Sequence, residues 1–388
     1  MKKSKLRSII CLLFVLIFLT SVFASGLIFL TRKGDYSKAE YSNAYTSAKA
    51  MCVMEAGSKR VFYNKNDKAK LAMASTTKIM TAITAIENCD DLDKPFEISP
   101  KAVGISGTSL YLRKGEVFTL RDLLYGLMLI SGNDASVAIG GYVGGNVKNF
   151  VDMMNKTAQK IGAVNSHFDN THGLDSQTHY TTAYDLALIT SYAMQNDTFR
   201  EIVSTKNKKI TNQDGKTRYL KNKNKLLDSL EGCVGVKTGF TDDAGRCLVS
   251  SCERDGMTVV CVVLNCGPMF EESSALLEQA FKDYHLVDLT SGYAFKNEVA
   301  VNEGRESSVK IGTFGNYYYP LKNSELKKVK YNYKVPNSLE APVEKGQEIG
   351  EVEIFIDNDL HFSEKIYTME SVRRNSIWEK LKDLVENW

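Results

Sequence analysis

The spacing of hydrophobic positions changes along the chain and predicts a fold that mixes helices and strands. Between residues 119 and 196 apolar residues recur at helical spacing, whereas between 232 and 264 they form short runs rich in β-branched residues. The predicted elements are a hairpin over 50–55 and 60–63, helices over about 75–87, 147–161, 182–194 and 270–284, and strands over 234–237, 247–251 and 258–264. This order predicts an α/β (α+β) domain over residues 46–288, with a sheet flanked by helices.

A second unit, residues 293–370, has a different pattern. Strand-like stretches such as 307–311, 329–333 and 352–356 are separated by turn signals, and no helical period is evident. We therefore predict a small all-β sandwich domain in this part of the chain.

The N-terminal pattern predicts export. Lys2, Lys3, Lys5 and Arg7 precede an apolar run over residues 9–30. We interpret residues 1–30 as a signal peptide or a retained membrane anchor, and residues 31–45 as a polar spacer. Both alternatives place the remaining chain outside the cytoplasm, because the positive end of such a segment stays inside.

Residues 373–388 end the chain with a predicted amphipathic helix. Trp378 and Trp388, the two tryptophans of the chain, fall on its apolar face. Indole rings favour the membrane interface, so we expect this helix to lie on the outer face of the cytoplasmic membrane. The alternative is a helix that packs on its own domain or on a partner.

Charge and cysteine usage narrow the classes of partner and site. Lys and Arg number 49 against 46 Asp and Glu, and no dense basic block occurs, so nucleic acid is not an expected partner. Eight cysteines include Cys11 in the export segment, and none forms a C-x-x-C pair, so we expect no metal and no cofactor. The other seven are predicted to be small buried hydrophobic residues, with a Cys261–Cys266 or Cys247–Cys252 disulfide left open.

The first candidate for chemistry is the S-x-x-K spacing of Ser75 and Lys78. It stands at the start of a predicted helix, where a spacing of three places both side chains on one face. A neutral Lys78 amine could then remove the hydroxyl proton of Ser75. The spacing alone is weak evidence, because Ser307–Lys310 and Ser324–Lys327 repeat it in the second unit, where strands would separate the two side chains.

Two downstream motifs give the first one its meaning. Ser131-Gly132-Asn133 interrupts two helical patterns and is predicted to lie on a tight loop. Lys237-Thr238-Gly239 ends an apolar strand, where Lys237 and Thr238 suit a substrate carboxylate and Gly239 permits close approach of a ligand backbone. The order S-x-x-K, S-x-N, K-T-G is typical of class A β-lactamases and penicillin-binding proteins.

With these motifs the chain resembles the low-molecular-mass penicillin-binding D-alanyl-D-alanine carboxypeptidases over about residues 45–370. Further segments similar to that family are residues 171–175, 182–187, 222–227 and 341–347. The resemblance implies a penicillin-binding/β-lactamase-like transpeptidase domain with an antiparallel sheet, a C-terminal β domain and a terminal membrane-associating helix. It also implies two kinds of ligand, namely peptidoglycan stem peptides that end in D-Ala-D-Ala and β-lactam antibiotics.

The resemblance further implies a role for each site residue. Ser75 would attack the carbonyl between the two D-alanines, with Lys78 as base. Ser131 and Lys237 would pass the proton to the leaving amine, and Asn133 would hold the substrate amide. The terminal carboxylate would bind to Lys237, Thr238 and Ser131, and the backbone N–H groups of Ser75 and Phe240 would form the oxyanion hole.

Three alternatives remain at this point. A β-lactamase would carry a deacylating Glu in an E-x-x-L-N segment, and Glu201, between the second and third motifs, lacks the following Leu-Asn. A D,D-endopeptidase would share every motif. A non-catalytic wall-binding protein could keep the fold without the activity. His172 is expected to structure its loop, and the oligomeric state and the third residue of the stem peptide stay open.

Overall fold

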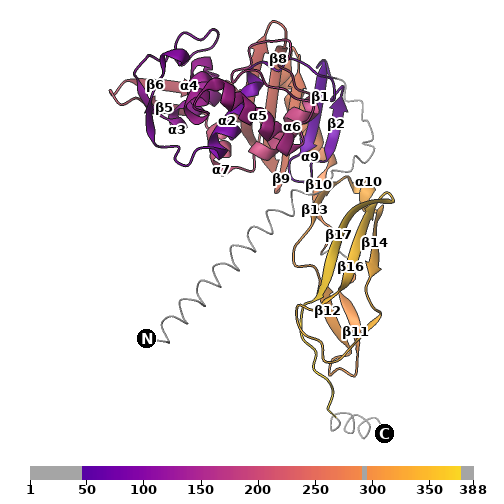
Figure 1. Ribbon diagram of the computed structural model, residues 1–388. Coiled ribbons are helices and arrows are strands. Elements are labelled where there is room, and N and C mark those ends of the chain that lie inside the picture. Colours follow the sequence, from indigo (N-terminus) through magenta and orange to yellow (C-terminus); the bar gives the residue numbers. More distant parts are fainter. Residues whose placement is uncertain (1–45, 291–294, 377–388) are drawn as a thin grey trace, which may run out of the picture. The chain divides into compact units, whose positions relative to one another are not determined.

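The computed structural model describes residues 46–290 and 295–376 (Figure 1). The predicted export segment and spacer lie outside these residues, as does the predicted terminal helix apart from residues 373–376. Among the helices that are described, none combines the length and the apolar character that a membrane span requires.

The elements of residues 46–290 follow the predicted order. They are β1 (Ala50–Glu55), β2 (Val61–Lys65), the 3₁₀ turn η1 (Ala74–Thr77), α2 (Lys78–Glu87), β3 (Pro95–Glu97), the 3₁₀ turn η2 (Pro100–Ala102), β4 (Val117–Thr119), α3 (Leu120–Leu129), α4 (Asn133–Val143), α5 (Val147–Ile161), α6 (Ala183–Ala193), α7 (Asp197–Ser204), β5 (Asn207–Thr211), β6 (Thr217–Lys221), α8 (Leu226–Ser229), β7 (Cys233–Thr241), β8 (Gly245–Arg254), β9 (Met257–Leu264), α9 (Met269–Asp283) and β10 (His285–Asp288). The predicted hairpin, helices and central strands are confirmed, although β7 and β8 extend beyond their predicted ends.

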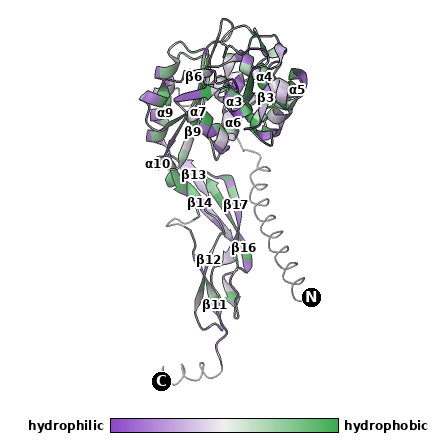
Figure 2. Ribbon diagram, turned by 90° about the vertical axis from the view of Figure 1, so that its left-hand side faces the viewer, coloured by the Kyte–Doolittle hydropathy of each residue, from purple (hydrophilic) through white to green (hydrophobic). Residues whose placement is uncertain are grey.

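A five-stranded sheet forms the centre of this domain. Its strand order is β2-β1-β9-β8-β7, and every neighbouring pair is antiparallel. Alternate residues of β1 enter two different cores: Cys52 packs with α2 to α7, and Val53 packs with α9. Figure 2 shows α9 and α5 on opposite sides of the domain. A sheet covered on both faces buries all of β1, and the predicted fold class is confirmed.

Helix α2 runs through the larger of the two cores. Its residues from Lys78 to Ile86 are all buried. Its threonines satisfy their hydroxyls internally, since Thr81 Oγ1 donates to the Thr171 carbonyl at 2.7 Å. A buried helix with satisfied polar groups gives the residues at its N-terminus a rigid, dry setting.

Helix α7 and the hairpin β5–β6 were not predicted. In the hairpin only Ile210 and Leu220 are buried, and the remaining residues of both strands are polar or exposed. One buried residue in each strand produces no detectable alternation, so the hydrophobic pattern could not identify these strands.

The second unit is a β domain, as predicted. Its elements are β11 (Glu298–Asn302), β12 (Ser308–Gly312), β13 (Tyr318–Leu321), α10 (Asn323–Leu326), β14 (Val329–Lys334), β15 (Ser338–Glu340), β16 (Glu348–Ile356) and β17 (Asp359–Thr368). Six of these strands form one hydrogen-bonded series in the order β14-β16-β17-β12-β11-β15, rather than two separate sheets, and β13 pairs with β10. Val309, Val352 and Ile366 are among the fully buried residues of its core.

The prediction that this unit contains no helix is wrong. The single turn α10 begins after Lys322, whose backbone N–H donates to the Glu325 carboxylate at 2.8 Å. A turn of four residues is too short to show a helical period. Ser324 therefore lies on a helical turn with Lys327 as its C-cap, so this copy of S-x-x-K does not lie in a strand as expected.

Candidate active site

Ser75 and Lys78 meet at the N-terminus of α2, at the junction with η1. Ser75 lies in η1, and Lys78 is the first residue of α2. Lys78 Nζ lies 3.0 Å from Ser75 Oγ, within hydrogen-bonding distance. Ala74, just before the serine, has a positive φ of 48°, which is a strained conformation for a residue with a side chain.

The Lys78 amine is buried and held by two oxygen acceptors. Its Nζ donates to Asn133 Oδ1 at 2.7 Å and to the His172 carbonyl at 2.7 Å. Burial, with the positive charges of Lys237 and Lys223, holds the pKa of Lys78 well below its usual value, although Asp134 opposes this shift. A neutral amine has two N–H donors and one lone pair, so these two bonds leave the lone pair free to accept the Ser75 proton.

The loop that contains His172 packs directly against η1, the turn that carries Ser75 and is called the nucleophile turn below. A Cβ on Gly173 would come within 1.9 Å of the Ala74 carbonyl oxygen, so only glycine fits there. His172 Nδ1 accepts the backbone N–H of Leu174 at 3.2 Å, which agrees with its predicted loop-structuring role. Burial lowers the pKa of His172 to about 4, so at neutral pH its ring adds no positive charge beside Lys78.

In the Ser131–Asn133 loop, the Asn133 side chain is hydrogen-bonded and the Ser131 side chain is not, within the part of the chain that the structure describes. Asn133 Nδ2 donates to the Ser106 carbonyl at 2.6 Å while its Oδ1 accepts from Lys78. Ser131 has a φ of 69°, and its Oγ is buried without a hydrogen-bond partner among the described residues. A buried hydroxyl without a partner costs free energy, which is typical of a group that awaits a ligand.

Asp134 fixes this loop in place. Its carboxylate accepts the backbone N–H groups of Leu110 at 2.8 Å and Leu112 at 2.9 Å, and the hydroxyl of Ser109 at 2.7 Å. Three hydrogen bonds to one carboxylate hold the 109–112 segment against the start of α4.

The third motif lies on β7. Lys237 is 1% exposed, and its Nζ donates to the Thr238 carbonyl at 3.0 Å. Burial, with the charge of Lys223, lowers the pKa of Lys237 to about 7. The structure gives a second reason for Gly239, besides the predicted ligand approach: a Cβ there would lie 3.0 Å from the Ser75 nitrogen and 3.2 Å from the Ala74 Cβ. Gly239 thus allows β7 to pack against the nucleophile turn.

These motifs surround an open cavity of about 440 Å³. Its lining includes the predicted residues Ser75, Ser131, Thr238, Gly239 and Phe240, while Lys78, Asn133 and Lys237 lie buried beneath it. Sequence reasoning missed the other lining residues, which are Thr108, Lys223, Arg246, Met269 and Phe270. Strand pairing explains one of them, because Arg246 of β8 lies directly opposite Phe240 of β7.

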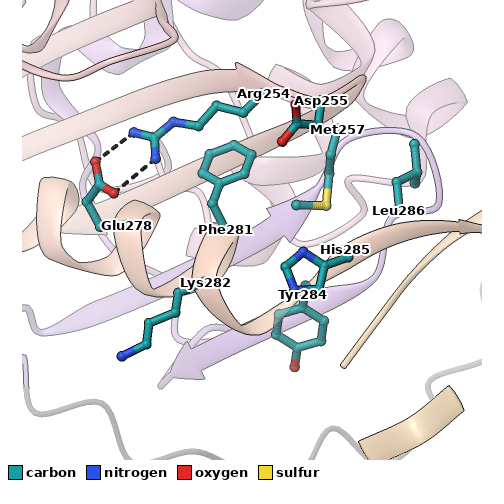
Figure 3. Close-up of a pocket in the computed structure, with 9 residues that line it drawn as sticks. All are labelled: Arg254, Asp255, Met257, Glu278, Phe281, Lys282, Tyr284, His285 and Leu286. Atoms are coloured by element: carbon teal, nitrogen blue, oxygen red, sulfur yellow. Dashed lines mark hydrogen bonds and ion pairs between the residues drawn. The ribbon is translucent and has the colours of Figure 1, made fainter. Parts of the chain in front are cut away.

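A second hollow of about 380 Å³ lies where β8 and α9 end and where β9 and β10 begin (Figure 3). Arg254 and Glu278 form a two-pronged ion pair on one side of it, with N–O distances of 2.6 and 2.9 Å. None of the predicted site residues is among the described residues that line it. The chemistry of the three motifs therefore belongs to the first cavity.

Comparison with known proteins agrees with this geometry. Residues 37–267, more than half of the chain, match the family described as D-alanyl-D-alanine carboxypeptidase. The chain belongs to this family. Residues 288–374 match the C-terminal domain of penicillin-binding protein 5.

Relatives of this carboxypeptidase chain cover most of its length. D-alanyl-D-alanine carboxypeptidase DacF of Bacillus subtilis is 29% identical over 88% of the chain and 90% of the relative. DacC of Escherichia coli is 30% identical over 87% of both chains. The solved structure of penicillin-binding protein 5 from Haemophilus influenzae matches 85% of the chain and 98% of its own, with a TM-score of 0.68 and 28% identity.

Membership of the carboxypeptidase family leaves the β-lactamase alternative without support. Glu201, the residue weighed above as a deacylating base, instead accepts the Tyr125 hydroxyl at 2.7 Å and does not line the cavity beside Ser75. Residues 131–237, all of which the structure describes, therefore contain no E-x-x-L-N glutamate of the kind that a β-lactamase uses as its second base.

Proposed function

We propose that this chain is a serine D,D-carboxypeptidase that removes the terminal D-alanine from peptidoglycan stem peptides through an acyl-enzyme on Ser75. The observation that carries the proposal is the Lys78 amine, which lies 3.0 Å from Ser75 Oγ with both of its N–H groups directed at other acceptors. Nucleophilic catalysis by serine requires such a neutral base within hydrogen-bonding reach.

The first half of the reaction forms the ester. Ser75 Oγ attacks the carbonyl between the two D-alanines as Lys78 takes its proton. The backbone N–H groups of Ser75 and Phe240 stabilise the oxyanion, which the close packing of Gly239 on the Ser75 nitrogen supports. The leaving D-alanine amine then takes a proton from Lys237 through the Ser131 hydroxyl, since a pKa of about 7 lets Lys237 donate near neutral pH.

The residues of the cavity also suggest how the substrate is held. The terminal carboxylate binds at Lys237 and Thr238, and Lys223 and Arg246, which line the same cavity, add positive charge. Asn133 directs its second amide hydrogen to the acyl chain.

The second half of the reaction hydrolyses the ester, because water cleaves the acyl-enzyme. A β-lactam reacts with Ser75 in the same way and leaves a slowly hydrolysed ester.

The predicted cellular setting is part of the same proposal. A basic segment followed by an apolar run in residues 1–30 supports export, and the two tryptophans of residues 373–388 support contact with the outer face of the cytoplasmic membrane. Protease accessibility in intact cells tests the first, and release of the protein by truncation at residue 372 tests the second.

Fluorescent penicillin distinguishes the proposal from its alternatives. Wild type should form a covalent fluorescent adduct, and Ser75→Ala should form none. A synthetic pentapeptide ending in D-Ala-D-Ala should release D-alanine only with wild type. Rapid turnover of the penicillin would instead indicate a β-lactamase. Preferential cleavage of cross-linked dimers would indicate an endopeptidase, and a wild type that is not labelled would indicate a wall-binding protein.

A further inference from the structure

Cys233 and Cys252 face each other across the hairpin that carries the third motif. The pairing of β7 with β8 places them directly opposite. The Glu253 N–H donates to the Gly232 carbonyl at 2.8 Å, and the Cys233 N–H donates to the Leu230 carbonyl at 3.2 Å. Cys233 and Cys252 therefore occupy a non-hydrogen-bonded position of the antiparallel ladder, a type of position where opposite Cα atoms lie about 4.5 Å apart. The register shifts directly after this pair, because Val234 has no partner between the pairs Cys233–Cys252 and Gly235–Ser251.

Both side chains also point to the same face of the sheet. Cys252 is fully buried in the core beneath α9, and Cys233 packs against that same core. Interaction with the Cys252 thiol lowers the pKa of Cys233, and interaction with the Cys233 thiol, together with burial, raises the pKa of Cys252. Disulfides join Cα atoms about 4.4–6.8 Å apart, so this pair could close with little backbone movement.

The same geometry excludes one disulfide that the sequence left open. Cys247 and Cys252 lie on the single strand β8, five residues and about 17 Å apart. An odd spacing along a strand also directs them to opposite faces, and they belong to different cores. Across the described residues all seven cysteines are free thiols, and five of them are buried.

We propose that Cys233 and Cys252 are a redox pair that closes into a cross-strand disulfide at the base of the β7–β8 hairpin. The Cys233 thiolate attacks a small-molecule disulfide, which forms a mixed disulfide and expels one thiol. The Cys252 sulfur, on losing its proton, then attacks the Cys233 sulfur and expels the second thiol. Two cysteine thiols are oxidised and one external disulfide is reduced to two thiols. This inference does not depend on the proposed reaction at Ser75.

The position of the pair predicts that the disulfide stabilises the hairpin and does not turn the activity on or off. We call this effect the stapling role. Lys237 lies four residues beyond Cys233 on β7, and the Gly235 carbonyl between them accepts the Asn224 amide at 2.7 Å and the Cys233 thiol at 3.5 Å. Closure removes the weak thiol donor and keeps the amide donor. The bond would enclose residues 233–252, which include the whole third motif, and would restrict the unfolding of this hairpin without a change at Ser75.

Mass spectrometry tests the bond itself. The native full-length protein is treated with oxidised glutathione, its free thiols are alkylated, and it is digested without reduction. We expect a linked peptide that joins Cys233 to Cys252. Cys252→Ala should leave Cys233 carrying glutathione, and the matched control Cys247→Ala should keep the linked peptide. Alkylation of both cysteines after oxidation, or a bond between another pair, would overturn the proposal.

Melting temperature tests the consequence. Oxidised wild type should melt about 5 °C or more above its reduced form, as expected for closing a loop of this size. The Cys252→Ala variant should show no redox-dependent difference. Labelling by fluorescent penicillin should differ less than twofold between the two forms of wild type. An unchanged or lower melting temperature, or a large fall in labelling, would contradict the stapling role.

Discussion

Two copies of the same sequence motif lie on helical turns in this molecule and have different surroundings. Ser75–Lys78 joins η1 to α2 in the first domain, and Ser324–Lys327 spans α10 in the β domain. Lys78 is fully buried with two oxygen acceptors, whereas Ser324 and Lys327 are both exposed. Both copies share the spacing and the helical turn, so these two features are not sufficient to make a catalytic pair.

Burial among specific partners makes the difference. In water a lysine stays protonated and cannot accept a proton from serine, whereas the buried Lys78 has a pKa well below its usual value. The Asn133 and His172 oxygens then orient the neutral amine. A search for S-x-x-K alone cannot separate these copies, and the residues that do so lie 55 and 94 positions farther along the chain.

Substitution of the two lysines should break the comparison most strongly. Lys78→Met keeps the length and apolar character of the buried side chain but removes the base, so acylation of Ser75 by fluorescent penicillin should fall about 10³-fold. Lys327→Met, the matched control, should label at the wild-type rate. Equal labelling of wild type and Lys78→Met would assign the base to another group.

Asn133→Asp should sharpen the role of the partner oxygens. A carboxylate 2.7 Å from Lys78 Nζ would stabilise the ammonium form and raise the pKa of Lys78. We expect a loss of about 10²-fold in acylation at pH 7 that is recovered as the pH rises towards 10, because the fraction of neutral amine grows about tenfold per pH unit. The pH profile of the labelling rate measures this shift. A loss that is uniform across pH would show that Asn133 acts on the substrate alone.

Gly239→Ala should produce a smaller effect on the same turn. The added Cβ would lie 3.0 Å from the Ser75 nitrogen and displace η1 by a few tenths of an ångström. Acylation should slow about tenfold, since small misplacements of a nucleophile are costly. Gly141→Ala, in open space on α4, is the control and should leave labelling unchanged. If both variants label normally, the packing of β7 on η1 does not position Ser75.

The sequence pattern predicted those helices and strands in which several apolar residues recur at regular spacing. The hairpin of β1 and β2, the helices α5 and α9 and the strands β7 to β9 belong to this group. Three of the elements it missed have too little burial to leave a pattern: α10 has no buried residue, and β5 and β6 have one each. Helix α7 differs from these, because Phe199, Ile202 and Val203 are buried at helical spacing, so its pattern was present in the sequence but was not recognised.

The site could be predicted in its motifs but not in its connections. Ser75, Ser131 and Lys237 are identifiable because each stands in a short signature with a suitable local structure. The His172 carbonyl that holds Lys78 is a backbone group, which no residue type reveals. Arg246 lines the cavity because of the β7–β8 register, and that register follows from the length of the turn between the strands.

Lys237→Met should test the cost of burying a lysine, with a modest effect on stability. Burial and the Lys223 charge lower the pKa of Lys237 to about 7, whereas a lysine in the unfolded chain has a pKa of about 10.4. At pH 7 folding must therefore remove a proton or bury a charge. We expect Lys237→Met to melt about 4 °C or more above wild type at pH 7, while Lys327→Met at the exposed site should stay within about 1 °C.

The pH dependence of this difference separates charge burial from simple repacking. Between pH 7 and 10 the unfolded wild type binds more protons than the folded form, so its free energy of unfolding rises with pH in this window. The methionine variant lacks this contribution, and the gap between the two melting temperatures should narrow as the pH approaches 10. A gap that stays constant from pH 7 to 10 would mean that the gain comes from apolar packing, and that the surroundings of Lys237 do not lower its pKa.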